Sequence, residues 1–121
     1  MTNLAKHESK NPIQRWLVAH SLDRIAALIR RVGARRVLDA GCGEGFGPRH
    51  LRSQLEPEVR LVGLDCSRRA LAEAVDRGTR SPLVRGDLYA LPWPRSTFDL
   101  VLAAEVLEHV AAGDVGADFT L

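Results

Sequence analysis

The sequence predicts an α/β fold in which an open parallel sheet is sandwiched between helices. Segments with helical periodicity alternate with short strand-like segments along the 121 residues. The strand-like segments are apolar runs without polar alternation, which is typical of parallel strands buried on both faces. The length and the 45% share of hydrophobic residues suffice for one domain with a core of its own.

A long amphipathic helix is expected to open the domain at Pro12, after a flexible tail over residues 1–11. Pro12 suits a first helical turn, and Gly33 suits the position after the last one. Apolar residues and one histidine recur between them at helical spacing: Ile13, Trp16, Leu17, His20, Ile25, Leu28, Ile29 and Val32. We expect Trp16 and His20 to face the core or its rim, and a lid over a ligand is the alternative.

Four strands and three further helices are expected in the rest of the domain, which is assigned to residues 12–121. The strands are expected over residues 37–40, 59–65, 82–87 and 98–105. The helices are expected over residues 46–55, 68–77 and from residue 106 onward. Ser67 can cap the second of these helices and Gly78 can end it. Trp93, in a proline-rich loop, is expected to pack in a rigid turn or to form the wall of a ligand pocket.

Acidic residues lie at or near the carboxyl ends of all four expected strands. They are Asp39, Asp65, Asp87 and Glu105. In an open parallel sheet these ends meet at one edge, and ligands bind beyond that edge. A buried strand has little use for a carboxylate, whereas a ligand with hydroxyls, an amine or a positive charge does. The sequence therefore predicts a ligand site at the carboxyl ends of the strands.

The stretch VLDAGCGEGFG, residues 37–47, joins the first strand to the next helix through four glycines at alternate positions. Its spacing fits neither the dinucleotide-binding pattern G-x-G-x-x-G nor the phosphate-binding loop, which needs a following Gly-Lys-Ser/Thr. Asp39 would also repel a phosphate. The loop thus favours a ligand that has no phosphate but carries positive charge, hydroxyls and an ammonium group, as S-adenosylmethionine does. A nicotinamide-dependent oxidoreductase is correspondingly disfavoured.

Three segments in succession, VLDAGCGEG, LVGLDCS and GDLYALPWPRSTFDLVLAAEVLEHV, resemble the motifs of class I S-adenosylmethionine-dependent methyltransferases, in particular the small-molecule and lipid-type group. The resemblance implies a Rossmann-like sheet, S-adenosylmethionine as cofactor, and methyl transfer to a small-molecule or lipid-like acceptor. A non-catalytic binding or interaction module, derived from half of this fold, is the alternative.

The resemblance implies roles around the methionine part of the cofactor. This part would contact Asp39 and the backbone of the residues that follow it, which are Ala40, Gly41, Cys42 and Gly43. The backbone carbonyls of Ala103 and Ala104 would accept hydrogen bonds from the ammonium group. Glu105 and His109 would face the methyl group and the acceptor, which makes them the candidate catalytic residues.

The resemblance also implies how the adenosine part would be held. Asp65 would accept hydrogen bonds from both ribose hydroxyls. Cys66 would pack beside the adenine. Asp87 would accept a hydrogen bond from the adenine amine, and the backbone N–H of Leu88 would reach the ring. These contacts would lay the adenosine along the carboxyl ends of the second and third strands.

The chain can be read only as far as the fourth strand of the seven that the resembled family has. The resemblance implies the strand order 3-2-1-4 and hence the cofactor-binding half of a methyltransferase. Gly113 and Gly116 interrupt the helical pattern after the fourth strand. The outer edge of that strand would lack a neighbour, which predicts self-association or pairing with a partner chain there.

Composition excludes several other classes of protein. The formal net charge is +2, and the short arginine clusters read as solvated helix ends and loops, so no nucleic-acid partner is indicated. No apolar run is long enough to span a membrane, and the polar start lacks the apolar stretch of a signal peptide, which predicts a cytoplasmic location. Cys42 and Cys66 have no metal-ligand spacing, and no metal site or disulfide is expected.

Overall fold

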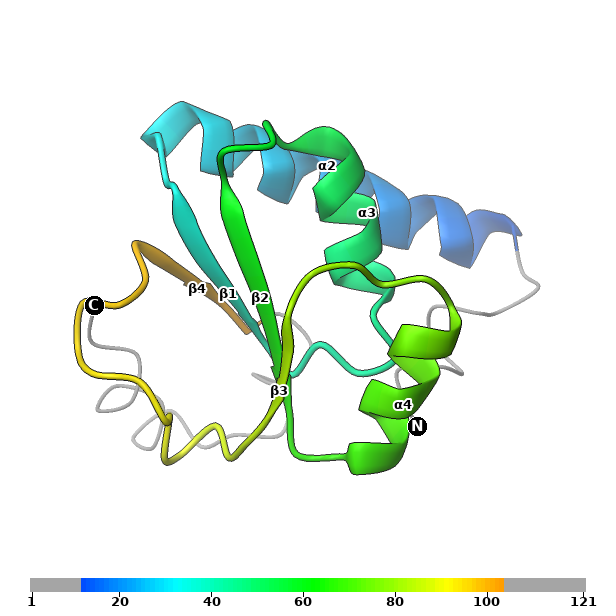
Figure 1. Ribbon diagram of the computed structural model, residues 1–121. Helices are drawn as coiled ribbons and strands as arrows, with labels where there is room; N and C mark the ends of the chain where they lie inside the picture. Colours follow the sequence, from blue (N-terminus) through cyan, green and yellow to red (C-terminus); the bar gives the residue numbers. More distant parts are fainter. Residues whose placement is uncertain (1–11, 104–121) are drawn as a thin grey trace.

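The computed structural model describes residues 12–103. These residues form one parallel sheet in the order β3-β2-β1-β4 (Figure 1). The strands are β1 (Arg36–Ala40), β2 (Arg60–Asp65), β3 (Leu83–Arg85) and β4 (Leu100–Leu102). The parallel α/β fold and the strand order 3-2-1-4 are therefore confirmed, although β3 and β4 are shorter than expected.

Helix α2 (Pro12–Val32) has the predicted bounds, and Gly33 follows it with a φ of 71°. Its buried face consists of Ala26 and Ile29, with Leu22 and Ile25 packed beside them. The expectation that Trp16 and His20 face the core is wrong. Trp16 is 61% exposed and stacks on the exposed His20, with ring centroids 5.0 Å apart. The first turns of α2 extend past the sheet and α3, so only its second half has a core to cover (Figure 1).

Helix α3 (Phe46–Gln54) connects β1 to β2, and helix α4 (Arg68–Asp76) connects β2 to β3. Leu51 of α3 and Leu55, which follows α3, belong to one core cluster with the buried side chains of α2. Val37 of β1 and Leu61 of β2 complete this cluster on the face of the sheet that α2 and α3 cover. In α4 the Ser67 hydroxyl accepts a hydrogen bond from Ala70 N, as its predicted capping role requires. Ala74 is fully buried, whereas Val75 is 60% exposed.

The connection from β3 back to β4 crosses the other face of the sheet. Its Leu88, Leu91 and Trp93 pack against a second core cluster of buried side chains. The members of this cluster are Leu38, Ala40, Leu64 and Phe98. Trp93 meets Phe98 edge to face, with ring centroids 4.9 Å apart. The packing interpretation of Trp93 is confirmed.

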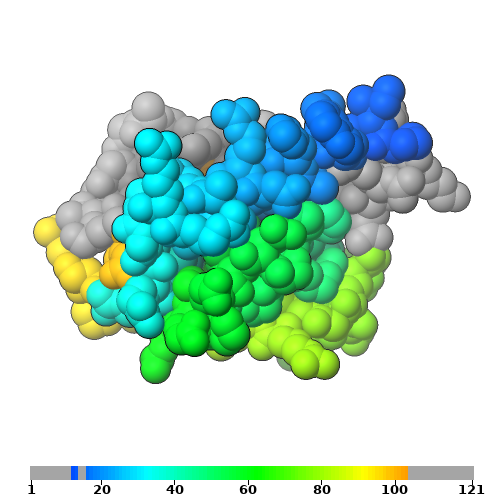
Figure 2. All heavy atoms as spheres, turned by 90° about the horizontal axis from the view of Figure 1, so that it is seen from above, coloured from blue at the N-terminus to red at the C-terminus, as the bar shows by residue number. Residues whose placement is uncertain are grey.

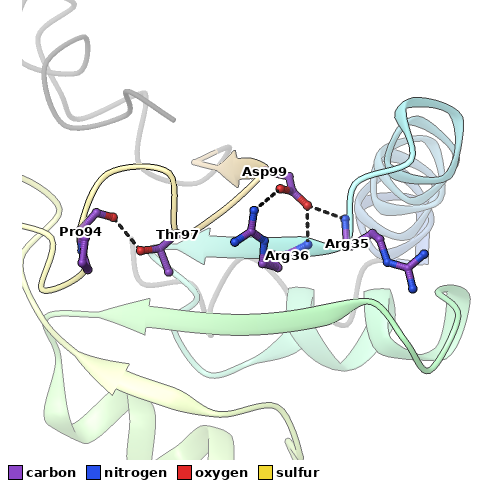
Figure 3. A network of polar contacts seen from close by, with 5 residues as sticks. All are labelled: Arg35, Arg36, Pro94, Thr97 and Asp99. Atoms are coloured by element: carbon purple, nitrogen blue, oxygen red, sulfur yellow. Dashed lines mark hydrogen bonds and ion pairs between the residues drawn. The ribbon is translucent and has the colours of Figure 1, made fainter.

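Asp99 ties β4 to β1 at the amino ends of the strands. Its carboxylate accepts hydrogen bonds from the backbone N–H groups of Arg35 and Arg36 and from the Arg36 guanidinium, at 2.8–2.9 Å (Figure 3). The Arg35 N–H, and then the contacts of Arg36, hold the pKa of Asp99 below its usual value. This contact contributes stability above the ordinary pKa of an aspartate, and the contribution is lost as the pH falls through the lowered value.

The outer edge of β4 has no neighbouring strand among residues 12–103. Self-association through this edge stays a prediction. In the same part of the chain, the structure contains no helix with the length and apolarity that a membrane span requires. The cytoplasmic location likewise remains a prediction.

Candidate functional site

The carboxyl ends of the four strands meet at one edge of the sheet, as the sequence predicts. The register pairs Ala40 with Leu64 and Asp65 with Arg85, so β1, β2 and β3 end side by side. The glycine loop, residues 41–45, leaves β1 at this edge and leads directly into α3. The loop and the carboxyl ends of β1, β2 and β3, where the sequence predicts a ligand site, therefore lie together.

Hydrogen bonds fix the glycine loop to the end of β2. The N–H groups of Gly41 and Cys42 both donate to the Leu64 carbonyl, at 2.6 and 2.9 Å. Gly43 N donates to Oδ2 of Asp65 at 2.8 Å, and Ser67 N donates to Oδ1 at 2.9 Å. Asp65 thus holds the loop and the start of α4 in place, a role that the sequence did not reveal. Each oxygen keeps a further acceptor position, because a carboxylate oxygen has two lone pairs.

Two of the four glycines make room for protein atoms, not for a ligand. Gly45 has a φ of 86°, and a Cβ there would lie 2.3 Å from Thr79 Oγ1 and 2.9 Å from Ala74 Cβ. A Cβ on Gly47 would lie 3.0 Å from Oδ2 of Asp39. Gly47 therefore lets the Asp39 carboxylate approach the first turn of α3, where the helix dipole favours negative charge. Close approach of a ligand at Gly41 and Gly43, which the resemblance implies, stays a prediction.

Three carboxylates act together on Cys42 at the centre of the loop. Burial raises the pKa of the Cys42 thiol far above its usual value, and the negative charges of Asp39, Asp65 and Glu44 raise it further. The thiol is consequently protonated and inert at neutral pH. Cys42 is buried and Cys66 is exposed, and both are free cysteines. The negative charges of Asp39, Asp65 and Glu44 therefore give the loop a negative electrostatic potential.

Glu44 is a residue that sequence reasoning missed. Its Oε2 atom is buried and accepts no hydrogen bond from any group within residues 12–103. Buried carboxylate oxygens are nearly always paired, because an unpaired one loses its hydration without compensation. The signal was present in the sequence as an acid between Gly43 and Gly45, but only the fold shows that its oxygen is buried.

Asp87 and Leu88 lie in a turn just after β3. Asp87 Oδ1 accepts a hydrogen bond from Tyr89 N at 2.9 Å, and Asp87 forms an isolated bridge with Ala90. The Asp87 side chain is exposed, whereas Leu88 packs against the second core cluster and anchors the turn. Ala103 is half-buried just after β4. Ala104, Glu105 and His109 lie outside the described residues.

Comparisons with known proteins identify one family. A family model described as a methyltransferase domain matches residues 37–119. A malonyl-[acyl-carrier protein] O-methyltransferase of Legionella pneumophila is 34% identical over 104 residues, which are 84% of this chain and 36% of that protein. A ubiquinone biosynthesis O-methyltransferase of Rhodopseudomonas palustris is 35% identical over 78% of this chain and 37% of its own length. The chain thus spans about a third of the length of these relatives.

Solved structures agree with this fold. The methyltransferase domain of bacterial CtHen1 is 26% identical and superposes with a TM-score of 0.70 over 84% of this chain and 57% of that one. The plantazolicin methyltransferase BpumL, solved in complex with SAH, shares the fold with a TM-score of 0.61 and 23% identity over 81% of this chain and 38% of that one. The strand order, the glycine loop and the family match lead to one conclusion: this chain belongs to the class I S-adenosylmethionine-dependent methyltransferase domain family.

Proposed function

We propose that this chain binds S-adenosylmethionine at its glycine loop and that a protein containing it transfers the methyl group to a small-molecule or lipid-like acceptor. The names of the relatives support this acceptor class, since they refer to malonyl-[acyl-carrier protein] and to ubiquinone biosynthesis. The proposal rests on the carboxylates of Asp39, Glu44 and Asp65 around the glycine loop. It rests also on the buried Oε2 atom of Glu44, which accepts no hydrogen bond within residues 12–103.

The charge of the site fits this cofactor better than it fits a phosphate ligand. S-adenosylmethionine carries a sulfonium, an ammonium group and ribose hydroxyls, all of which are attracted to carboxylates. Asp39, Glu44 and Asp65 lie close enough to Cys42 for their charges to raise its pKa. A phosphate placed at the same loop would meet three negative charges with little water between them to screen the repulsion.

The cofactor, when bound, supplies a methyl group on positively charged sulfur, which an acceptor atom takes by in-line displacement. The task of the chain is to hold the donor in a fixed orientation, since positioning of two reactants accounts for much of such catalysis. We assign the ribose hydroxyls to the remaining acceptor positions of Asp65. Cys66, Asp87 and the N–H of Leu88 are assigned to the adenine.

The other proposed contacts complete the site. The methionine part lies along Gly41 to Gly43, near Asp39, with its ammonium group toward the carbonyls of Ala103 and Ala104. Glu105 and His109 are the proposed residues nearest the acceptor, and a histidine there is suited to remove a proton from it. Glu44 is added to this set as an acceptor for a donor group of the cofactor.

Glu44→Gln tests the role proposed for Glu44 in binding the cofactor. The substitution should weaken binding of S-adenosylmethionine by about tenfold or more, because a hydrogen bond to a charged acceptor is worth ~1.5–3 kcal/mol. The same substitution should leave the Tm of the ligand-free chain unchanged or raise it, since a neutral amide is less costly to bury than an unpaired carboxylate. Calorimetric titration and thermal unfolding measure the two effects.

Glu56→Gln is the matched control, because Glu56 is exposed in the turn between α3 and β2. It should change neither the affinity nor the Tm. A purely structural Glu44 would lower the Tm together with the affinity when it is replaced. Unchanged affinity in Glu44→Gln would show that Glu44 does not contact the cofactor. It would also count against the proposal that the carboxylates around the loop attract the positive charge of S-adenosylmethionine.

A further inference from the structure

The end of the sheet opposite the glycine loop carries two adjoining open hollows. The first is lined by Arg35, Arg36, Glu58, Arg60 and Asp99. The second has a volume of about 460 Å³ and lies between the segments around Arg60 and Arg80. Arg60 lines both. Figure 2 looks down on this end of the molecule, where the segments at the start of β1 and β2 lie side by side.

Positive charge predominates in these hollows. Together they are lined by five arginines and two acids. Asp99 is already paired with the Arg36 guanidinium at 2.9 Å. Within residues 12–103, no carboxylate pairs with Arg35, Arg60 or Arg80, and all three side chains are exposed. Three guanidinium groups therefore face solvent, and Glu58 is the one acid lining the hollows that has no ion pair within residues 12–103.

The second hollow combines this charge with an apolar floor. Pro57, Val59, Val62 and Pro82 line it beside Arg60 and Arg80, and its volume admits a leucine or phenylalanine side chain. No aromatic residue lines either hollow. Single-stranded nucleic acid is typically held by aromatic stacking platforms along a basic groove, which these hollows lack. Apolar pockets rimmed by arginine are instead typical of protein interfaces.

We propose that the arginine end, defined as Arg35, Arg60 and Arg80 with the apolar hollow between Pro57 and Pro82, is a docking surface for an acidic partner protein. The partner places carboxylates on the three guanidinium groups, whose planar shape suits bidentate contacts, and inserts one apolar side chain into the hollow. Docking here leaves the glycine loop open, because the loop lies at the other end of the strands. The proposal is independent of the proposed function.

Fluorescence anisotropy with defined probes tests this surface. The probes are a short labelled peptide of glutamate and leucine, the same peptide with alanine for leucine, the same peptide with lysine for glutamate, and a single-stranded uridylate oligonucleotide. The glutamate–leucine peptide should bind tightest and the lysine peptide not at all. If the alanine peptide binds equally well, the proposed apolar contact in the hollow is wrong. If the oligonucleotide binds more tightly than the peptides, the partner is a nucleic acid and not an acidic protein.

Charge reversal locates the binding. Arg60→Glu should weaken binding of the glutamate–leucine peptide by about tenfold or more, because Arg60 lines both hollows. Arg69→Glu is the control with the same change of charge, since Arg69 is exposed on α4 near the opposite end of the strands. Circular dichroism verifies that both variants are folded. Equal losses in the two variants, or no loss in Arg60→Glu, would overturn the proposal.

Discussion

Asp65→Ala is expected to weaken binding of S-adenosylhomocysteine, the product of the donor, by more than about tenfold, since each charge-assisted hydrogen bond that is lost contributes ~1.5–3 kcal/mol. The effect has two sources. The ribose hydroxyls lose their proposed acceptor, and the N–H groups of Gly43 and Ser67 lose theirs. The glycine loop is then no longer held against the end of β2. Calorimetric titration of both proteins measures the difference.

Asp65→Asn removes the negative charge of this side chain but nearly keeps its shape. The amide has one oxygen, so its NH2 group would face the N–H of either Gly43 or Ser67. We therefore expect Asn to be nearly as damaging as Ala. Asp76→Ala, an exposed change at the end of α4, is the control and should bind as the unmodified chain does. Full affinity in Asp65→Ala would refute the assigned role of this residue.

Gly45→Ala is expected to destabilise the fold by about 2–5 kcal/mol, the sum of a left-handed backbone penalty of ~1–2 and an overpacking penalty of ~1–3. The new methyl group would be forced against Thr79 Oγ1 and Ala74 Cβ, at 2.3 and 2.9 Å. Thr79 also accepts a hydrogen bond from Arg49 at 2.9 Å, which its displacement would disturb. Urea unfolding of both chains measures the loss.

Gly78→Ala isolates the backbone part of that penalty. Gly78 has a φ of 90°, close to that of Gly45, but nothing lies within 4 Å of a Cβ placed there. Its substitution should cost only the left-handed term, about 1–2 kcal/mol. Equal losses at Gly45 and Gly78 would show that packing against Thr79 and Ala74 plays no part.

Apolar runs and glycine positions predicted the order of helices and strands, because both depend on the local conformational preferences of the chain. Helix α2 begins and ends where Pro12 and Gly33 place it. The alternation of helix and strand predicted a parallel sheet, and Asp39, Asp65 and Asp87 do lie at or near the carboxyl ends of its strands. Periodicity failed at Trp16, because a helical stripe shows which side is apolar but not how far the neighbouring elements extend along the helix.

The sequence predicted which residues lie at the carboxyl ends of the strands, but not the contacts that these residues make. The acid at Asp65 was recognised, but its bonds to Gly43 and Ser67 depend on how a loop and a helix start pack across β2. Gly45 was noted only as one of four glycines in the loop, whereas it makes room for Thr79, more than thirty residues away in sequence. Such contacts are set by tertiary packing, which a local pattern does not contain. Glu44 escaped notice for the same reason.

We propose that this loop selects a positively charged nucleoside donor over a phosphate-bearing nucleotide. Calorimetric titration of the folded chain with S-adenosylmethionine, with NAD and ATP titrated in parallel, tests this selectivity. We expect saturable binding of S-adenosylmethionine and no binding of NAD or ATP at the same concentrations. Absence of heat with S-adenosylmethionine from a chain shown to be folded, or tighter binding of either phosphate-bearing nucleotide, would contradict it.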